Sequence, residues 1–497
     1  MVYKTMLGRV VPLVAIAGML VGCSGGTRTF VSADPLNDVV NPSLTSRERV
    51  SVVSQFPSLI EDGTLGRESA IERLKAVAWA REVVPTEREA AMIVLLGETA
   101  LLDDSEAVSF VAQILPTEPQ ASIARYLVGQ AALNGWRELT PAIVRRFARP
   151  DASTADTRRP EYAALQALHP ERDVEETVFQ VFRESGGLDD SGRLRRDAWN
   201  LLSRLDASGD IRVNLLGGLA RSQEQEDDPT LDALRRALLE LRTIPLTGQE
   251  LEWLVQLASR ENADWWQSVN VIVRTLDAPQ QRGLRLRHME PLRWASTFRR
   301  DWTRMSKGAL LDVLEDQLDA ETLHRRRAGA VASENLESWR DRLSFGDAVT
   351  LRVVSEAIRE PRVIAALFDQ AEEDRADTTT EYGGVLRLAQ NRTSRGMFTA
   401  VSYPPRASIR EGDTSFVASR ELIDESATSL AHYHLHAQRV RNSQYAGPSD
   451  GDLNYASLYG RTCIVFTTVS EDEMNADAFF PSGAVIDLGT LRRSEGR

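Results

Sequence analysis

The chain has 497 residues, of which 42% are hydrophobic and 26% are charged. This composition excludes a globally disordered protein, and the length suffices for about three domains. The formal net charge of -13 repels phosphate backbones and the sequence has no basic stripe, so nucleic-acid binding is disfavoured. Only three residues are lysine, which leaves almost no candidates for Schiff-base or Walker-loop chemistry.

Residues 1–23 have the form of a targeting segment. Basic residues open it, residues 10–21 are an apolar run too short for a comfortable membrane span, and LVGC ends it. A plain signal peptide or a short anchor helix would share the first two features. The ending resembles the lipobox of bacterial lipoproteins, which implies that Cys23 is lipidated and anchors the chain in the cell envelope. Ser24, directly after it, implies the outer membrane, on the periplasmic face.

Residues 24–64 follow the targeting segment. They are rich in Ser, Gly, Thr, Pro and Asp and have little hydrophobic periodicity. We therefore expect a flexible tether that leads away from the membrane.

Residues 65–345 have the periodicity of amphipathic helices. In RESAIERLKAVAWARE, for example, Ala70, Leu74 and Val77 share one face. Similar helices follow in pairs, and the pairs begin roughly 34 to 40 residues apart, which is typical of an α-solenoid. The pattern loosely resembles HEAT-type repeats, which implies an extended surface that recruits a protein partner. A non-repetitive helical domain is the alternative.

Residues 346–497 indicate a mixed α/β domain, so the chain is expected to be a multidomain protein with its all-α region first. A helical pattern continues to about Arg375, and β-branched runs then alternate with turns. These runs are GVLRL, MFTAVSY, SFVAS, HYHLH, TCIVFTTV and GAVIDLG. Cys463 lies in one of them, and we expect it to be a small buried residue of a strand rather than a nucleophile.

Three of the six histidines fall within five residues of one expected strand, at His432, His434 and His436. Alternate residues of a strand point to the same face, so two of these imidazoles can bind one metal ion. Zinc accepts nitrogen and carboxylate ligands, and Asp452 beyond the next turn is a candidate third ligand. His432 lies on the same face and competes with the other two histidines as a ligand.

The combination of three motifs is more specific than the histidines alone. His434-x-His436 is followed by Ser449-x-x-Asp452 and preceded by Glu381 in EYGGVL, just after a helix. This order resembles the signature of JAB/MPN/JAMM zinc metallopeptidases. The resemblance implies a cytidine-deaminase-like β-sheet with helices for residues 346–497.

The resemblance also implies a role for each motif residue. His434, His436 and Asp452 would bind Zn²⁺, and Glu381 would take a proton from the zinc-bound water. Ser449 would donate a hydrogen bond to the oxyanion of the intermediate. The expected protein is a membrane-anchored metallopeptidase or isopeptidase-like hydrolase, whose substrate is a protein or peptide.

Two departures from the family pattern keep a second function open. Ala437 replaces the usual proline, and the segment AQRVRNSQYAGP between His436 and Ser449 is longer than is common in the family. The alternative is a non-catalytic envelope lipoprotein scaffold with a degenerate JAB/MPN-like domain, which uses its helical repeats to bind proteins. A third possibility is a zinc ion that only stabilises the domain.

Overall fold

The computed structural model describes residues 30–97, 100–151, 153–185, 192–221, 228–318, 334–389 and 398–493. Cys23 and the apolar run before it lie outside these ranges, so the expected lipidation site has no structural description. No helix within the described ranges is long and apolar enough to cross a membrane.

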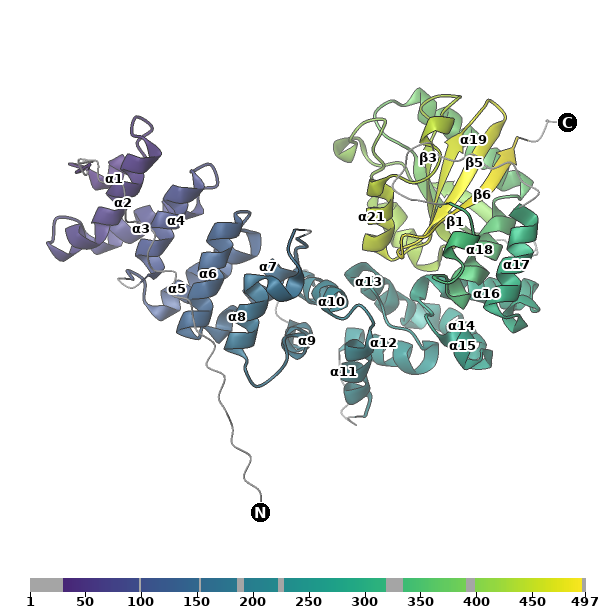
Figure 1. Ribbon diagram of the computed structural model, residues 1–497, viewed down its shortest axis with the longest axis horizontal. Helices are drawn as coiled ribbons and strands as arrows, with labels where there is room; N and C mark the ends of the chain where they lie inside the picture. The colour runs from purple at the N-terminus through teal and green to yellow at the C-terminus, as the bar shows by residue number, and fades with distance from the viewer. Residues whose placement is uncertain are drawn as a thin grey trace, which may run out of the picture. The chain divides into compact units, whose positions relative to one another are not determined.

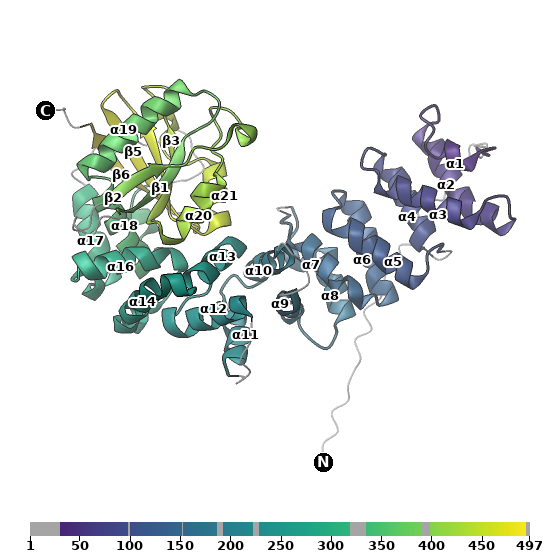
Figure 2. The same cartoon turned by 180° about the vertical axis from the view of Figure 1, so that it is seen from behind.

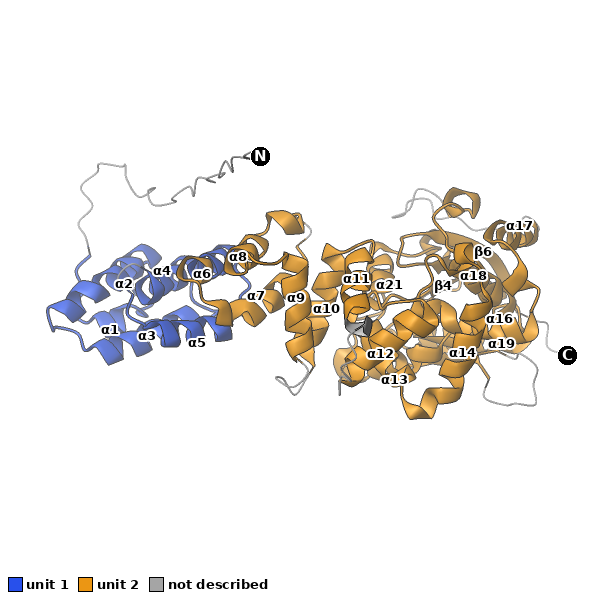
Figure 3. Ribbon diagram, turned by 90° about the horizontal axis from the view of Figure 1, so that it is seen from below, with its two compact units in different colours: residues 1–114, 118–130 blue, residues 115–117, 131–497 orange. Residues whose placement is uncertain are grey.

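The chain divides into two compact units, which Figure 3 shows in different colours. Unit 1 comprises residues 1–114 and 118–130, and unit 2 comprises residues 115–117 and 131–497. The boundary expected at 345/346 lies within unit 2. It falls at the start of α18 (Phe345–Ala357), which packs against α16 and α17 within unit 2.

Unit 1 is helical. Its elements are α1 (Pro35–Asp38), α2 (Ser46–Glu61), α3 (Arg67–Trp79), α4 (Pro85–Leu96), α5 (Asp104–Ile114) and the first ten residues of α6 (Ala121–Asn134). The expectation of a flexible tether over 24–64 is wrong where α1 and α2 form. A capping box between Thr45 and Glu48 starts α2, and Val52, Val53 and Phe56 are buried where α2 packs on α4.

The helical region continues into unit 2, as Figure 1 shows. Its helices are α7 (Thr140–Ala148), α8 (Pro160–Leu168), α9 (Val174–Glu184), α10 (Arg193–Leu205), α11 (Asp210–Arg221), α12 (Pro229–Arg236), α13 (Gly248–Leu257), α14 (Ala263–Thr275), α15 (Ala278–Gln281), α16 (Met289–Phe298) and α17 (Lys307–Leu318). Many neighbours in sequence are neighbours in space, such as α9 with α10 and α12 with α13. The helical periodicity of the sequence is thus confirmed as secondary structure.

An α/β region ends the chain, as expected. It follows α18 and α19 (Pro361–Ala376) and contains two further helices, α20 (Arg420–Glu425) and α21 (Asp450–Tyr459). Its strands are β1 (Gly383–Leu388), β2 (Phe398–Ser402), β3 (Ala431–His436), β4 (Cys463–Thr468), β5 (Glu473–Phe479) and β6 (Val485–Arg492). They form one sheet in the order β2-β1-β3-β4-β5-β6, in which only β3 and β4 are parallel.

Two strand expectations differ from the structure. Residues 415–419 (SFVAS) form no strand, because they lie in the loop before α20, where Ser419 is the N-cap. β5 was not expected at all. It carries Asn475 and Asp477 on a fully buried face, so its sequence EMNADAF lacks the apolar alternation of a strand.

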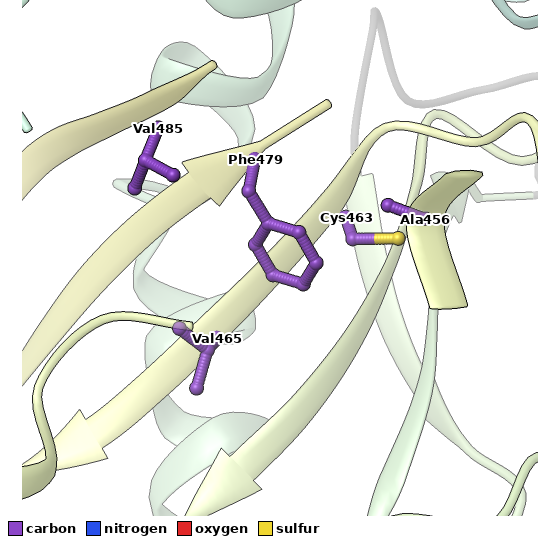
Figure 4. Packing of buried hydrophobic residues seen from close by; sticks show 5 residues of the cluster. All are labelled: Ala456, Cys463, Val465, Phe479 and Val485. Carbon is purple, nitrogen blue, oxygen red and sulfur yellow. The ribbon is translucent and has the colours of Figure 1, made fainter. Parts of the chain in front are cut away.

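The two faces of the sheet are covered by different helices. α19 covers one face, as the reverse view in Figure 2 shows, and Gln370 on it accepts a 2.6 Å hydrogen bond from the Tyr433 hydroxyl of β3. α21 covers the other face, where Ala456 packs into a core cluster with Cys463, Val465, Phe479 and Val485 (Figure 4). Cys463 is thus a buried strand residue, as expected, and burial raises the pKa of its thiol.

Candidate metal centre

The candidate centre lies where β3 ends and α21 begins. β3 is an inner strand, paired with β1 on one side and with β4 on the other. The connection from β3 through α21 to β4 joins parallel strands, so the first turn of α21 returns to the carboxyl end of β3. Alternation along β3 places His432, His434 and His436 on the face that α21 covers.

His434, His436 and Asp452 converge at this point. Nε2 of His434 lies 3.3 Å from Nε2 of His436 and 3.2 Å from Oδ1 of Asp452. Nε2 of His436 lies 4.0 Å from Oδ2 of the same carboxylate. The side chains of His434, His436 and Asp452 are 4%, 12% and 12% exposed, so the cluster is largely shielded from water.

The two shorter distances match the coordination shell of a small ion, and the 4.0 Å distance exceeds it. Tetrahedral Zn²⁺ with bonds of about 2.0–2.1 Å holds its ligand atoms roughly 3.3 Å apart. Without an ion, the same contacts are a hydrogen bond between two imidazoles and an ion pair with Asp452. The distances from His434 to its two neighbours therefore fit zinc.

The remaining ring nitrogen of His436 is also engaged. Its Nδ1 lies 2.9 Å from the backbone carbonyl oxygen of Tyr445. A carbonyl oxygen only accepts hydrogen bonds, so Nδ1 carries the proton and Nε2 presents its lone pair to the cluster. Metal-binding histidines commonly have such an outer partner, which fixes the tautomer and the orientation of the ring.

Ser449 and Asp452 form the capping box of α21. Ser449 is the N-cap: its Oγ accepts from the Asp452 backbone N–H at 3.2 Å and donates to Oδ2 of Asp452 at 2.8 Å. The backbone N–H of Ser449 donates to the same Oδ2 at 2.7 Å. These bonds occupy Oδ2 and leave Oδ1 directed at His434. The hydroxyl of Ser449 donates its proton to Asp452 in this structure. It must therefore rotate before it can donate to an oxyanion.

Glu381 lies beside the histidines. One oxygen of Glu381 and one ring nitrogen each of His434 and His436 all lie within 4.8 Å of one another. Glu381 is 5% exposed, and burial, together with the nearby charge of Asp452, raises the pKa of Glu381 to about 7. A carboxylate with a pKa near 7 suits proton transfer at neutral pH. A bound dication would lower this pKa.

The centre contains more carboxyl groups than basic side chains to pair with them. Asp374 of α19 is fully buried, and its charge acts on both Glu381 and His434. Burial raises the pKa of Asp374 to about 8. Among the described residues, neither Asp374 nor Glu381 has an arginine or lysine ion-pair partner, and Asp452 is paired only with histidines. A buried excess of carboxylates is stabilised by protons or by a bound cation.

Burial and neighbouring charges also shift the pKa values of His434 and Asp452. Burial by itself lowers the pKa of His434, but Asp452 and Glu381 raise it above its ordinary value. Burial opposes the ionised form of Asp452, but the adjacent His434 and His436 hold its pKa below the ordinary value. Asp452 is therefore ionised, which is the form that binds a metal.

A pocket of about 560 Å³ opens onto the centre. Its wall includes Glu381, His436 and Asp452 together with aromatic residues, among them Phe416 and Tyr445. The ring of Phe416 stacks on that of His434, with centroids 5.2 Å apart. His436 and Asp452 thus border a cavity large enough for part of a peptide.

His432 is not part of this group. Its Nδ1 lies 2.8 Å from the hydroxyl of Tyr455 on α21, and its ring meets that of Trp253 edge-on at 6.4 Å. It is 1% exposed, and burial, reinforced by the charge of Arg461, lowers its pKa. The structure therefore places His432 in the packing between α13 and α21, which favours His434 and His436 as the pair of ligands.

The structure adds residues that the motifs did not indicate. Gln438 and Asn442 come from the segment that looked like an insertion, and Gln438 hydrogen-bonds to Glu381. Phe416 comes from a loop far from the histidines in sequence. No spacing rule connects these positions with the centre.

Comparisons of the chain with protein-family models, curated proteins and solved structures found no match.

Proposed function

We propose that the α/β region is a zinc-dependent hydrolase of the JAB/MPN/JAMM type, which cleaves an amide bond in a protein or peptide. Under this proposal the region has the JAB/MPN fold, and the helices before it form a HEAT-like repeat. The protein acts as a lipid-anchored component of a bacterial envelope. The observation that carries the proposal is the convergence of residues from three separate parts of the chain. Ligand atoms of Glu381, His434 and His436 lie within 4.8 Å of one another, and Asp452 lies 3.2 Å from His434.

The donor set suits zinc. Two imidazole nitrogens and one carboxylate oxygen are the usual protein ligands of a catalytic zinc site, which keeps one position open. The tautomer of His436 and the ionised Asp452 are both in the metal-binding form. When bound, Zn²⁺ would supply Lewis acidity, which polarises a carbonyl and makes water more acidic.

The chain's own residues would perform the proton transfers. Glu381 would accept a proton from water at its carboxylate and later deliver it to the leaving amine. Gln438 would hold that carboxylate in position through its 2.6 Å hydrogen bond. Ser449 would orient Asp452, and after turning, its hydroxyl would donate to the oxyanion of the intermediate.

A partner surface in the helical region belongs to the same proposal. In unit 1 a cleft of about 960 Å³ lies between α3 and α5. Trp79, which is 51% exposed, lines it together with Phe110, Lys75 and Arg81. An exposed tryptophan beside charged residues is typical of a protein-binding surface, and we propose that a protein partner docks here.

The experiment that tests the hydrolase is metal analysis of the purified full-length chain in detergent. We expect close to one zinc per wild-type chain and none in the double variant His434→Ala/His436→Ala. The matched control is His169→Ala, which removes a histidine bonded to Thr140 away from the centre and should keep the zinc. A wild-type protein without zinc after expression with added zinc would favour the envelope scaffold instead.

A further inference from the structure

A second buried polar cluster lies outside the candidate metal centre. It is formed by Glu250 of α13, Arg287 of the 3-10 turn Leu286–His288, and Arg461, two residues before β4. These residues are 0%, 6% and 1% exposed. The charge of each guanidinium acts on Glu250, and the two guanidinium charges act on each other, so the three groups share one region of space.

Each arginine in the cluster uses only one of its three side-chain nitrogens. Nη2 of Arg287 donates to Oδ1 of Asp347 at 2.9 Å. Nη2 of Arg461 donates to the carbonyl oxygen of Ser429 at 2.7 Å and to its hydroxyl at 2.9 Å. Nε and Nη1 of both arginines are buried and have no hydrogen-bond partner among the described residues. Buried guanidinium donors without acceptors are costly, so a group other than these side chains is needed to accept from them.

Glu250 does not fill that need. Its Oε2 accepts from the backbone N–H of Leu246 at 2.5 Å, while Oε1 is buried without a hydrogen-bond partner in the described part of the chain. Oε1 lies against the residue before Arg461, because a Cβ at Gly460 would be 2.7 Å from it. Within the described ranges Glu250 makes no ion pair with either arginine.

The charges of the cluster indicate what occupies it. Burial raises the pKa of Glu250, which favours its neutral form, and neutral Oε1 can itself donate. The carboxylate of Asp347 is shared between Arg287 and His288. Arg461 has no carboxylate partner among the described residues. Water would satisfy the free donors but leave this buried positive charge uncompensated, whereas an anion does both.

We propose that Arg287 and Arg461 bind a small inorganic oxyanion, such as phosphate or sulfate, through the Nε and Nη1 atoms of both guanidinium groups. Paired guanidinium donors match the oxygens of such anions. The guanidinium of Arg461 lies over the ring of Trp253 at 5.2 Å, and Trp253 contacts His432 on β3. The anion would therefore join α13 to the strand that carries the histidines. This site is independent of the zinc proposal.

The first test is thermal unfolding of the full-length chain in detergent, in buffers of equal ionic strength. We expect phosphate and sulfate to raise the midpoint by roughly 2–4 °C over chloride. Arg287→Met and Arg461→Met should each abolish this difference. The matched control is Arg159→Met, which removes an equally buried arginine that is paired with Glu161 at 3.0 Å. It should lower the midpoint but keep the difference between the anions.

Glu250→Gln covers the case in which the arginine variants do not fold. It keeps the size of the side chain and removes its negative form, so the oxyanion effect should persist or grow. A crystal grown with selenate locates the ion: an anomalous selenium peak within hydrogen-bond distance of both arginines supports the site. Water alone at that position, or an oxyanion effect unchanged in Arg287→Met and Arg461→Met, would overturn the proposal.

Discussion

Nε2 of Gln438 donates a 2.6 Å hydrogen bond to Oε1 of Glu381 and a 2.8 Å hydrogen bond to the backbone carbonyl oxygen of Asp413. The other end of the amide is also held, because Nδ2 of Asn442 donates to Oε1 of Gln438 at 2.7 Å. Asn442 is 1% exposed. Gln438 thus holds the carboxylate of Glu381, which we assign as the base, and Asn442 in turn holds Gln438 in place.

Replacing Gln438 by leucine should separate metal binding from turnover. Gln438→Leu leaves the candidate ligand atoms intact, so the zinc content should equal that of the wild type. The rate on a peptide that the wild type hydrolyses should fall about tenfold or more, since Glu381 loses its hydrogen-bond donor. The measurements are zinc per chain and kcat. Gln444→Leu, an exposed change in the same segment, is the control, and an equal loss in both variants would contradict the positioning role.

Glu381→Gln should keep zinc and lose activity. The amide has the shape of the carboxylate but cannot accept and carry a proton, so kcat should fall by about 100-fold or more. Zinc analysis of the same sample shows whether the loss is chemical. If the variant loses its zinc, Glu381 is a ligand and its assignment as the base is wrong.

Ser449→Ala should weaken both the helix and the metal site. Loss of the N-cap bond of α21 should lower the free energy of unfolding by about 1 kcal/mol. Because the hydroxyl also orients Asp452, zinc affinity should fall roughly 10- to 100-fold. The control is Ser419→Ala, which removes the N-cap of α20. Ser419→Ala should lower the free energy of unfolding by a similar amount and leave zinc affinity unchanged. If Ser419→Ala also lowered zinc affinity, the loss in Ser449→Ala would be explained by reduced stability alone.

His432→Phe should retain zinc, whereas His434→Phe should not. His432 bonds to the hydroxyl of Tyr455, so the phenylalanine variant leaves that hydroxyl without its imidazole partner. We expect the free energy of unfolding to drop by about 1–3 kcal/mol with no change in zinc per chain. Denaturant titration and metal analysis measure the two effects. Loss of zinc from a folded His432→Phe protein would make His432 a ligand.

The helical region shows where sequence patterns are reliable and where they fail. The stripe of Ala70, Leu74 and Val77 predicted α3, because the periodicity of a helix depends only on its own backbone. The helix α2 was missed, since polar residues surround its short buried stripe. Its Thr45 to Glu48 capping box was the local signal that could have located it.

The sheet shows the same limit. β4 has a continuous apolar and β-branched run, and β1 and β3 have shorter stretches of strand-forming residues between turns; these patterns predicted the three strands. β5 became a strand through its partners: Asp477 lies opposite Val465 of β4 and Asp487 of β6. Asn475 and Asp477 are buried in β5, but no local sequence pattern indicates that these polar residues belong to the core.

The sequence by itself determined the features that depend on short-range geometry. These are the placement of His432, His434 and His436 on one strand face and the capping of α21 by Ser449 and Asp452. Only the tertiary structure decided that His434 meets Asp452 while His432 meets Tyr455, and that Gln438 holds Glu381. Those contacts depend on strand order, on the path of the connection from β3 to β4, and on how α21 packs. Such long-range packing brings together segments whose separation in sequence carries no information about their distance in space.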